Sequence, residues 1–237
     1  MTEPATPSAP RTARERVRLE LTGEIKSHAL AQLAAGGGSA LSLRGIAREM
    51  GMASSALFRY FGSRDALLTA LIIDGYSALA DAAEAAEAGV RDRSVEDRWL
   101  AICHGVRDWA VANPAQYTLI FGSPIPGYAA PPDTVGPASR VPLLLGELLA
   151  DLLADGTYDP AAHPEPPAAV RRAIEPVRAT IPPEIPADLL VRGLMAWTYL
   201  FGAVSFEVFG HRHDVIGDPP AFFDHEVRRL AELLGLV

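Results

Sequence analysis

The sequence predicts an all-α protein: an N-terminal three-helix domain with a helix-turn-helix, joined by a long helix to a helical body. Apolar residues recur at three- and four-residue steps, the period of an amphipathic helix, in most segments between the glycine and proline clusters. No segment shows a convincing strand alternation. With 237 residues, 49% hydrophobic and 21% charged, the chain is long and apolar enough to bury a core.

The N-terminal domain is predicted over residues 11–70 and the body over 71–237. Residues 1–10 are expected to form a disordered tail, because they have neither the basic start nor the apolar core of a targeting peptide. The first helix carries an apolar stripe at four-residue steps, and Gly36-Gly37-Gly38 ends it. The stripe consists of Val17, Leu21, Ile25, Ala29 and Leu33.

Residues 41–68 carry the helix-turn-helix pattern. Ser42 is suited to cap a short helix. Ala47 is small where two helices cross closely, Gly51 can adopt the positive φ of a tight turn, and Leu57 fills the gap between the two helices. Ser54 begins the second helix, and Gly62-Ser63 separates it from a long helix over about 64–88.

The body is predicted to contain more helices and two long connections. Apolar spacing predicts a helix around 99–109 and a short segment over 117–121. Stretches 122–142 and 160–186 hold 14 of the 20 prolines, so both are expected to be connections. A compact helix over 143–153 separates them, and 171–178 is expected to form a helix broken at Pro176.

The last two helices are expected to form a dimer interface. Residues 187–210 approach the length of a membrane span, but Arg192 and Glu207 argue against one. A helix that is apolar all round packs against its own core and a second subunit, and a two-helix contribution from each subunit gives a four-helix bundle. The alternative is a monomer in which the last helix caps the core. The expected interface residues are Phe206, Phe209, Phe223, Val227, Leu230 and Leu234.

Charge is distributed unevenly along the chain. The net charge is −8, yet residues 11–66 hold nine basic and five acidic residues, and residues 67–237 carry −11. A basic N-terminal block on an acidic body is expected where only one end meets a polyanion, although local variation in charge could also produce it.

The sequence resembles the tetracycline-repressor (TetR) family of bacterial transcription regulators, over roughly residues 14–75. The family's signature across its recognition helix is matched by Leu57-Phe58-Arg59-Tyr60-Phe61 and Arg64. In the body, Trp197, Phe201-Gly202 and Glu207 are similar to the W…HG…E pattern of one subgroup, with Phe201 in place of histidine.

The resemblance implies a cytoplasmic regulator that binds double-stranded DNA as a homodimer, at an inverted repeat, and most often as a repressor released by a small ligand. An activator or a ligand-insensitive regulator would have the same fold. The expected DNA-binding residues are Ser42, Arg44, Ser54, Ser55, Phe58, Arg59, Tyr60 and Arg64.

Each of these DNA-binding residues has a physical role. Ser42 can place a hydroxyl on a phosphate, and Arg44 can reach a base edge or a phosphate. Ser54 and Ser55 lie at the exposed start of the helix that enters the major groove. Arg59, Tyr60 and Arg64 are expected to bind phosphates, the alternative for both arginines being solvated charge. Phe58 is expected either to contact a sugar or a thymine or to pack in the core.

The body is expected to bind an apolar or aromatic effector in a cavity, and no cofactor or metal. Candidate lining residues are Trp99, His104, Tyr117, Phe121, Trp197 and Phe201, each of which could instead be plain core. An enzyme is the rival class, but its best evidence, His211-Arg212-His213-Asp214 and Cys103-His104, is weak. Cys103 is the only cysteine, so the chain cannot form an intramolecular disulfide. The thiol is expected to be either buried and inert or a redox sensor.

Overall fold

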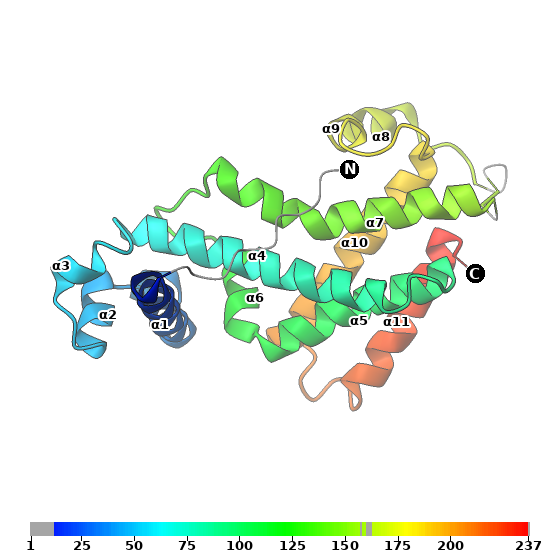
Figure 1. Ribbon diagram of the computed structural model, residues 1–237. Coiled ribbons are helices and arrows are strands. Elements are labelled where there is room, and N and C mark those ends of the chain that lie inside the picture. Colours follow the sequence, from blue (N-terminus) through cyan, green and yellow to red (C-terminus); the bar gives the residue numbers. More distant parts are fainter. Residues whose placement is uncertain (1–11, 157, 160–162, 237) are drawn as a thin grey trace. The chain divides into compact units, whose positions relative to one another are not determined.

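A computed structural model describes residues 12–156, 158–159 and 163–236, so the predicted tail over 1–10 lies outside the described residues. Within the described part every regular element is helical, as Figure 1 shows. The chain divides into two compact units. One comprises residues 1–72 together with 122–130, and the other comprises 73–121 and 131–237.

The N-terminal unit is built on α1 (Ala13–Gly36). A capping box begins this helix, because Thr12 accepts a hydrogen bond from the backbone N–H of Glu15 and the Glu15 carboxylate accepts one from Thr12. Ile25, Ala29 and Leu33 of the predicted stripe are buried, whereas Val17 is 52% exposed. The stripe therefore reaches the core only in the second half of the helix.

The predicted helix-turn-helix is present as α2 (Leu43–Glu49) and α3 (Ser54–Leu57), preceded by the short 3-10 helix η1 (Gly38–Ala40). Ser42 caps α2 by accepting a hydrogen bond from the backbone N–H of Gly45 at 3.1 Å. Gly51 has a φ of +65°, a conformation that favours glycine, and Leu57 is fully buried. Turn chemistry and packing thus agree with the sequence pattern.

The connection 122–130 belongs to the N-terminal unit, which the sequence pattern did not indicate. Ile125 lies so close to Gly38 that a Cβ at Gly38 would be 2.7 Å from Ile125 Cγ1. The Tyr128 hydroxyl is 2.9 Å from Thr69 Oγ1 on α4 (Arg64–Ala88), the long helix that continues into the second unit. This proline-rich connection is anchored to the N-terminal unit at two places.

The second unit contains the rest of α4 and seven further α-helices of the described chain. They are α5 (Val95–Ala112), α6 (Pro114–Phe121), α7 (Val135–Asp155), α8 (Ala168–Ala173), α9 (Glu175–Arg178), α10 (Ala187–Val208) and α11 (Pro219–Leu234), with a short 3-10 helix, η2 (Pro132–Thr134), before α7. α5 and α10 pack against each other and against both α7 and α11. Their facing apolar side chains form the core of this unit.

The proline-rich stretches differ in part from what the sequence predicts. α7 begins at Val135 and contains Pro142, so the expected connection over 122–142 is helical in its last third. The apolar residues that follow pack α7 into the core, which outweighs the cost of a proline within the helix. The helix expected over 171–178 is broken, but the break falls at Ile174, between α8 and α9. Pro176 itself lies in the first turn of α9, where its missing N–H costs nothing.

The expected dimer interface also needs correction. Phe223, Val227, Leu230 and Leu234 are at most 7% exposed and belong to the core of the second unit, because this stripe of α11 faces α5 and α10. Phe206 and Phe209 are 55% and 38% exposed. The stripe with the clearest apolar periodicity packs inside the subunit, and other residues of α10 and α11 remain on the surface.

Two helices, α4 and α10, are long and apolar enough to cross a membrane by length and composition alone. In the most apolar 18-residue segment of each helix, 44% of α4 and 39% of α10 is buried inside the protein. Core helices of soluble proteins pass the same test. In α10, Arg192 pairs with Asp188 at 2.9 Å and Glu207 pairs with Arg107 of α5, so the charges that argued against a span lie in internal ion pairs.

Candidate functional site

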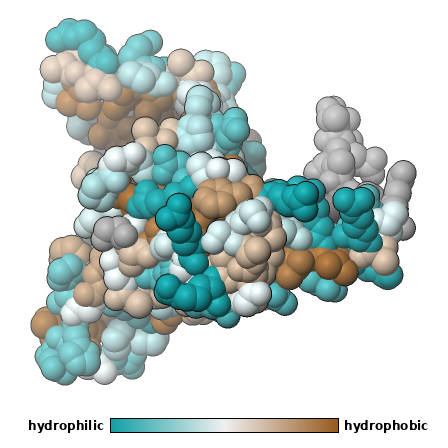
Figure 2. All heavy atoms as spheres, turned by 90° about the vertical axis from the view of Figure 1, so that its left-hand side faces the viewer, coloured by the Kyte–Doolittle hydropathy of each residue, from teal (hydrophilic) through white to brown (hydrophobic). Residues whose placement is uncertain are grey.

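The helix-turn-helix presents a polar, exposed surface. Arg44 on α2 and Ser54 and Ser55 at the start of α3 are exposed, as is Ser42. Phe58 is 43% exposed, which rules out a purely core position for this ring. Hydrophilic side chains are interspersed with apolar ones on the face that Figure 2 shows. These five of the residues expected to bind DNA are therefore accessible.

A side-chain network that the sequence analysis missed holds α2 against α1. Gln32 of α1 accepts a hydrogen bond from the backbone N–H of Ser42 at 2.9 Å and donates one to Glu49 at 3.0 Å. His28 Nδ1 lies 3.2 Å from the other Glu49 oxygen. These contacts fix the start and the end of α2. No local motif identifies them, because the partners are 10 to 21 residues apart.

The three residues expected to bind phosphates, all of which come after α3, differ in their surroundings. Arg59 is exposed, while Tyr60 is half-buried with the Arg18 guanidinium 5.9 Å from its ring centre. Arg64 donates a hydrogen bond to the carbonyl oxygen of Gly38 at 2.6 Å and lies 3.4 Å from Asp65. Its guanidinium thus joins the start of α4 to the connection between α1 and α2, a structural role that the sequence did not suggest.

A cavity of about 550 Å³ lies in the second unit between α5, α7, α10 and the chain after α9. Trp99 and Trp197, two of the six residues expected to line a ligand cavity, lie in its wall. The remaining wall is mostly aliphatic and includes Leu145, Leu149 and Ile181. The wall contains no charged residue.

Three of the other expected ligand residues form a packed aromatic cluster. The Phe121 ring lies 5.0 Å from Tyr117 and 4.6 Å from Phe201, centre to centre. The Tyr117 hydroxyl donates a hydrogen bond to the Phe201 carbonyl oxygen and contacts Ser205. Burial raises the pKa of Tyr117 to about 12. These three rings do not line the 550 Å³ cavity. They belong to the hydrophobic core of the second unit or pack against it.

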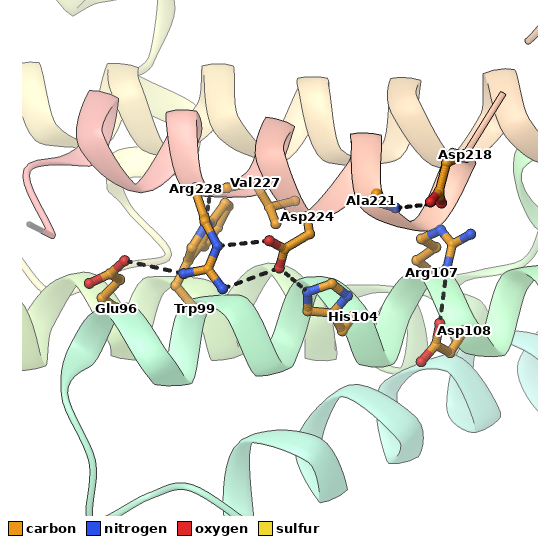
Figure 3. A network of polar contacts seen from close by, with 10 residues as sticks. All are labelled: Glu96, Trp99, His104, Arg107, Asp108, Asp218, Ala221, Asp224, Val227 and Arg228. Carbon is orange, nitrogen blue, oxygen red and sulfur yellow. Dashed lines mark hydrogen bonds and ion pairs between the residues drawn. The ribbon is translucent and has the colours of Figure 1, made fainter. Parts of the chain in front are cut away.

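His104 takes part in a polar network between α5 and α11, shown in Figure 3. Its Nε2 lies 3.1 Å from Asp224, which also accepts a hydrogen bond from Arg228 at 2.8 Å. The hydrogen bond from Arg228, and the smaller contribution of His104, outweigh partial burial and hold the pKa of Asp224 below its usual range. Beside them the Trp99 indole N–H donates to the Val227 carbonyl oxygen at 2.8 Å.

The residues behind the rival interpretations are not brought together. Cys103 is fully buried, and burial raises the pKa of its thiol well above the usual value. The His213 side chain is 83% exposed and lies 3.6 Å from Asp214. Among the described residues, no group of three His, Cys, Asp or Glu side chains is placed to hold a metal ion.

Two family models match this chain. The model described as "Bacterial regulatory proteins, tetR family" matches residues 25–71, which contain both helices of the helix-turn-helix. The model described as "Tetracyclin repressor-like, C-terminal domain" matches residues 99–230, more than half of the chain. This chain belongs to the TetR family.

Relatives of this TetR-family protein match it over nearly its whole length. The HTH-type transcriptional regulators Rv1816 of Mycobacterium tuberculosis and Mb1846 of Mycobacterium bovis are each 40% identical over 234 residues, covering 94% of this chain and 95% of theirs. The solved structure of the regulatory protein SCO4313 is 35% identical, has a TM-score of 0.76, and is matched over 93% of this chain and 100% of its own.

The family sets the general function of this TetR-family protein: it is a helix-turn-helix transcriptional regulator. Members of the family bind DNA, typically dimerise and respond to small molecules, and are typically soluble and cytoplasmic. The match over residues 25–71 includes every residue expected to bind DNA.

Proposed function

We propose that this regulator is a cytoplasmic, homodimeric repressor that binds an inverted-repeat operator and is released when a small apolar molecule occupies the 550 Å³ cavity. The proposal assigns it no catalytic activity. The observation that carries the DNA-binding part is the exposed start of α3, with Ser54 and Ser55, in the unit that holds the basic surplus. Short side chains there favour readout through thymine methyls, water and DNA shape.

The chemistry of the cavity wall supports an uncharged, largely hydrocarbon effector. The wall contains two hydroxyls, and both already donate within the chain, Ser139 to the carbonyl of Val135 and Thr180 to that of Val177, each at 2.8 Å. The Trp99 N–H is likewise engaged by Val227. A charged ligand would lose its hydration without gaining a counter-charge, whereas an apolar one gains from burial.

The surface residues of α10 and α11 support a dimer. Met195, Tyr199, Gly202 and Phe206 are exposed at four-, three- and four-residue steps along α10, so they share one face. On α11, Phe222 and Leu233 are 40% and 37% exposed. A Cβ at Gly202 would meet nothing within 4 Å, so this position can admit a partner helix. Contiguous exposed apolar residues of this kind mark association surfaces.

We infer that the effector acts on DNA binding through the covalent links between the two units. The chain passes between them inside α4 and at both ends of connection 122–130. Ile125 and Tyr128 anchor that connection to the N-terminal unit, and α7, which lines the cavity, follows it. A ligand that favours one arrangement of α7 would thereby bias the DNA-binding unit.

The DNA-binding part is tested by selecting bound fragments from random DNA with purified protein at two salt concentrations. Enrichment of one inverted repeat, weakened by salt, is the expected result. Arg44→Ala should mainly relax sequence preference, while Arg64→Ala should weaken binding to all sequences. Binding of a single subunit to a non-palindromic site would refute the proposal that a homodimer binds the operator. A reporter gene driven from the selected site separates repression from activation.

The ligand part is tested by filling the cavity. Gly146 lies in the wall, and a Cβ added there would have Ile181 Cγ2 as its nearest neighbour at 3.8 Å, so Gly146→Leu would place a side chain in the cavity. The variant should keep DNA binding and lose release by long-chain alcohols or esters. Gly136→Leu, on the same helix and away from the wall, is the control. If Gly146→Leu responds as the wild type does, the effector binds elsewhere.

A further inference from the structure

A second basic feature of the N-terminal unit extends from the helix-turn-helix onto α1. Arg14 and Arg18 on α1 and Arg59 after α3 line one groove of about 720 Å³, which we call the arginine groove. Arg14 and Arg18 are four residues apart, so they share a face of α1. The other lining residues are Ala13, Val17, Met52, Ala56 and Tyr60.

Among the residues that the structure describes, no acidic side chain neutralises the positive charges in the arginine groove. Within the described residues, no ion pair or side-chain hydrogen bond joins Arg14, Arg18 or Arg59 to an acidic group, although Arg18 lies over the Tyr60 ring. Glu15, the carboxylate next to Arg14 in the sequence, is engaged in the capping box with Thr12. Three guanidinium groups that line one exposed groove repel one another and attract a polyanion.

The arginine groove is continuous with the helix-turn-helix. Met52 belongs to the turn between α2 and α3, and Ala56 belongs to α3 itself, so the groove and the recognition helix share residues. When a helix enters the major groove of DNA, the phosphates of the flanking strands lie along both of its sides. The groove is therefore next to the position that a phosphodiester backbone would occupy.

We propose that the arginine groove binds the phosphodiester backbone of the operator beside α3, with Arg14 and Arg18 of α1 as phosphate-binding residues in addition to the helix-turn-helix. The inference rests on the proposed DNA-binding function and extends the contact surface to α1. Contacts to phosphate carry no sequence information, so Arg14 and Arg18 contribute to affinity and to salt dependence without selecting the operator.

The test compares single-charge removals on the same helix in the full chain. Arg14→Gln and Arg18→Gln remove charges from the groove, whereas Arg16→Gln removes an exposed charge that does not line it. Binding is measured by fluorescence anisotropy on the selected operator and on a scrambled duplex between about 50 and 200 mM salt.

Each groove variant should bind both duplexes about three- to tenfold more weakly and lower the slope of log affinity against log salt by about one. Arg16→Gln should change affinity less than about twofold and keep the slope. Arg18→Lys should restore the slope, which separates charge from packing on Tyr60, and thermal unfolding checks that each variant is folded.

Three results would overturn the proposal. Arg14→Gln and Arg18→Gln could match Arg16→Gln in affinity and slope, or they could weaken only the operator, which would indicate base readout. Titration with inorganic phosphate could also reveal a small-anion site that these substitutions abolish while DNA binding is unchanged. If the wild type enriches no DNA, the proposed function itself fails, and the wild-type selection shows this separately from any variant.

Discussion

Replacing Glu207 by glutamine tests how the second unit is held together. The Glu207 carboxylate of α10 accepts two hydrogen bonds from Arg107 of α5, at 2.8 Å from Nε and 2.5 Å from Nη2. The Arg107 side chain is only 10% exposed and the Glu207 side chain only 15%. Arg107 also lies 3.3 Å from Asp108, whose side chain is 70% exposed, and its guanidinium lies 5.5 Å from the centre of the Phe223 ring.

The expected loss follows from this geometry. Glutamine keeps the shape and one acceptor, but it turns an amide N–H₂ toward the guanidinium and leaves the buried charge of Arg107 with only the exposed Asp108 as a counter-ion. Removing one partner of a buried ion pair costs about 3–5 kcal/mol, and a hydrogen bond to a charged group contributes about 1.5–3 kcal/mol. Since one hydrogen bond can survive, we expect a loss of about 3 kcal/mol. For a protein of this size that lowers Tm by about 6–12 °C.

Tryptophan fluorescence is a suitable assay, because all three tryptophans, Trp99, Trp109 and Trp197, belong to the second unit. Asp108→Asn is the matched control: it removes the exposed partner of the same arginine and should cost less than about 1 kcal/mol. A loss below about 1 kcal/mol for Glu207→Gln, or an equal loss for both variants, would refute the reasoning. In that case the pair would contribute no more than an exposed one.

Three further predictions follow from particular contacts. Gly38→Ala should destabilise the N-terminal unit by about 1–3 kcal/mol, because the new Cβ would lie 2.7 Å from Ile125 Cγ1. Gly62→Ala is the control and should be nearly neutral, because a Cβ there would meet nothing within 4 Å. Hydrogen exchange of α1 and α2 measures the effect of both substitutions. Cys103 should react with a thiol reagent at least about a hundredfold more slowly in the folded protein than in urea, since it is buried and its pKa is raised; equal rates would favour a redox sensor. Hydrogen bonds from Tyr158 and Arg192 outweigh burial and lower the pKa of Asp188, so its contribution to stability is present above its unfolded pKa and is lost as pH falls through the folded value. Asp188→Asn should therefore flatten the acid limb of a stability–pH curve, and an unchanged limb would contradict this.

The sequence was sufficient to predict features that depend on local rules. Ser42 as a cap, Gly51 in a tight turn and Leu57 as a buried plug each follow from residue type and spacing, and the structure confirms all three. The same run of residues carries the resemblance to the TetR family. Proline content predicted helix boundaries less well, since Pro142 lies inside α7 and Pro176 lies in the first turn of α9.

The function of a helix face could not be predicted in the same way. Phe223, Val227, Leu230 and Leu234 form a stripe with clear periodicity, but periodicity does not tell which neighbour covers the stripe. In the structure α5 and α10 cover it, and other residues of α10, such as Met195 and Phe206, remain exposed. Residue type likewise does not tell which expected ligand residues line a cavity. Trp99 and Trp197 line it, whereas Tyr117, Phe121 and Phe201 pack on one another.

Charge composition predicted function better than it predicted individual contacts. In the acidic second unit carboxylates surround the arginines, so that Arg98 binds Glu87 and Asp151, Arg107 binds Glu207, and Arg140 binds Asp81 and Glu84. These guanidinium groups stabilise the fold and are not free for a polyanion. In the N-terminal unit basic residues outnumber acidic ones, and Arg14, Arg18 and Arg59 share a groove without an acidic partner among the described residues. The same residue type thus supports packing in one unit and is available for DNA in the other, because the local balance of charge decides which partner it meets.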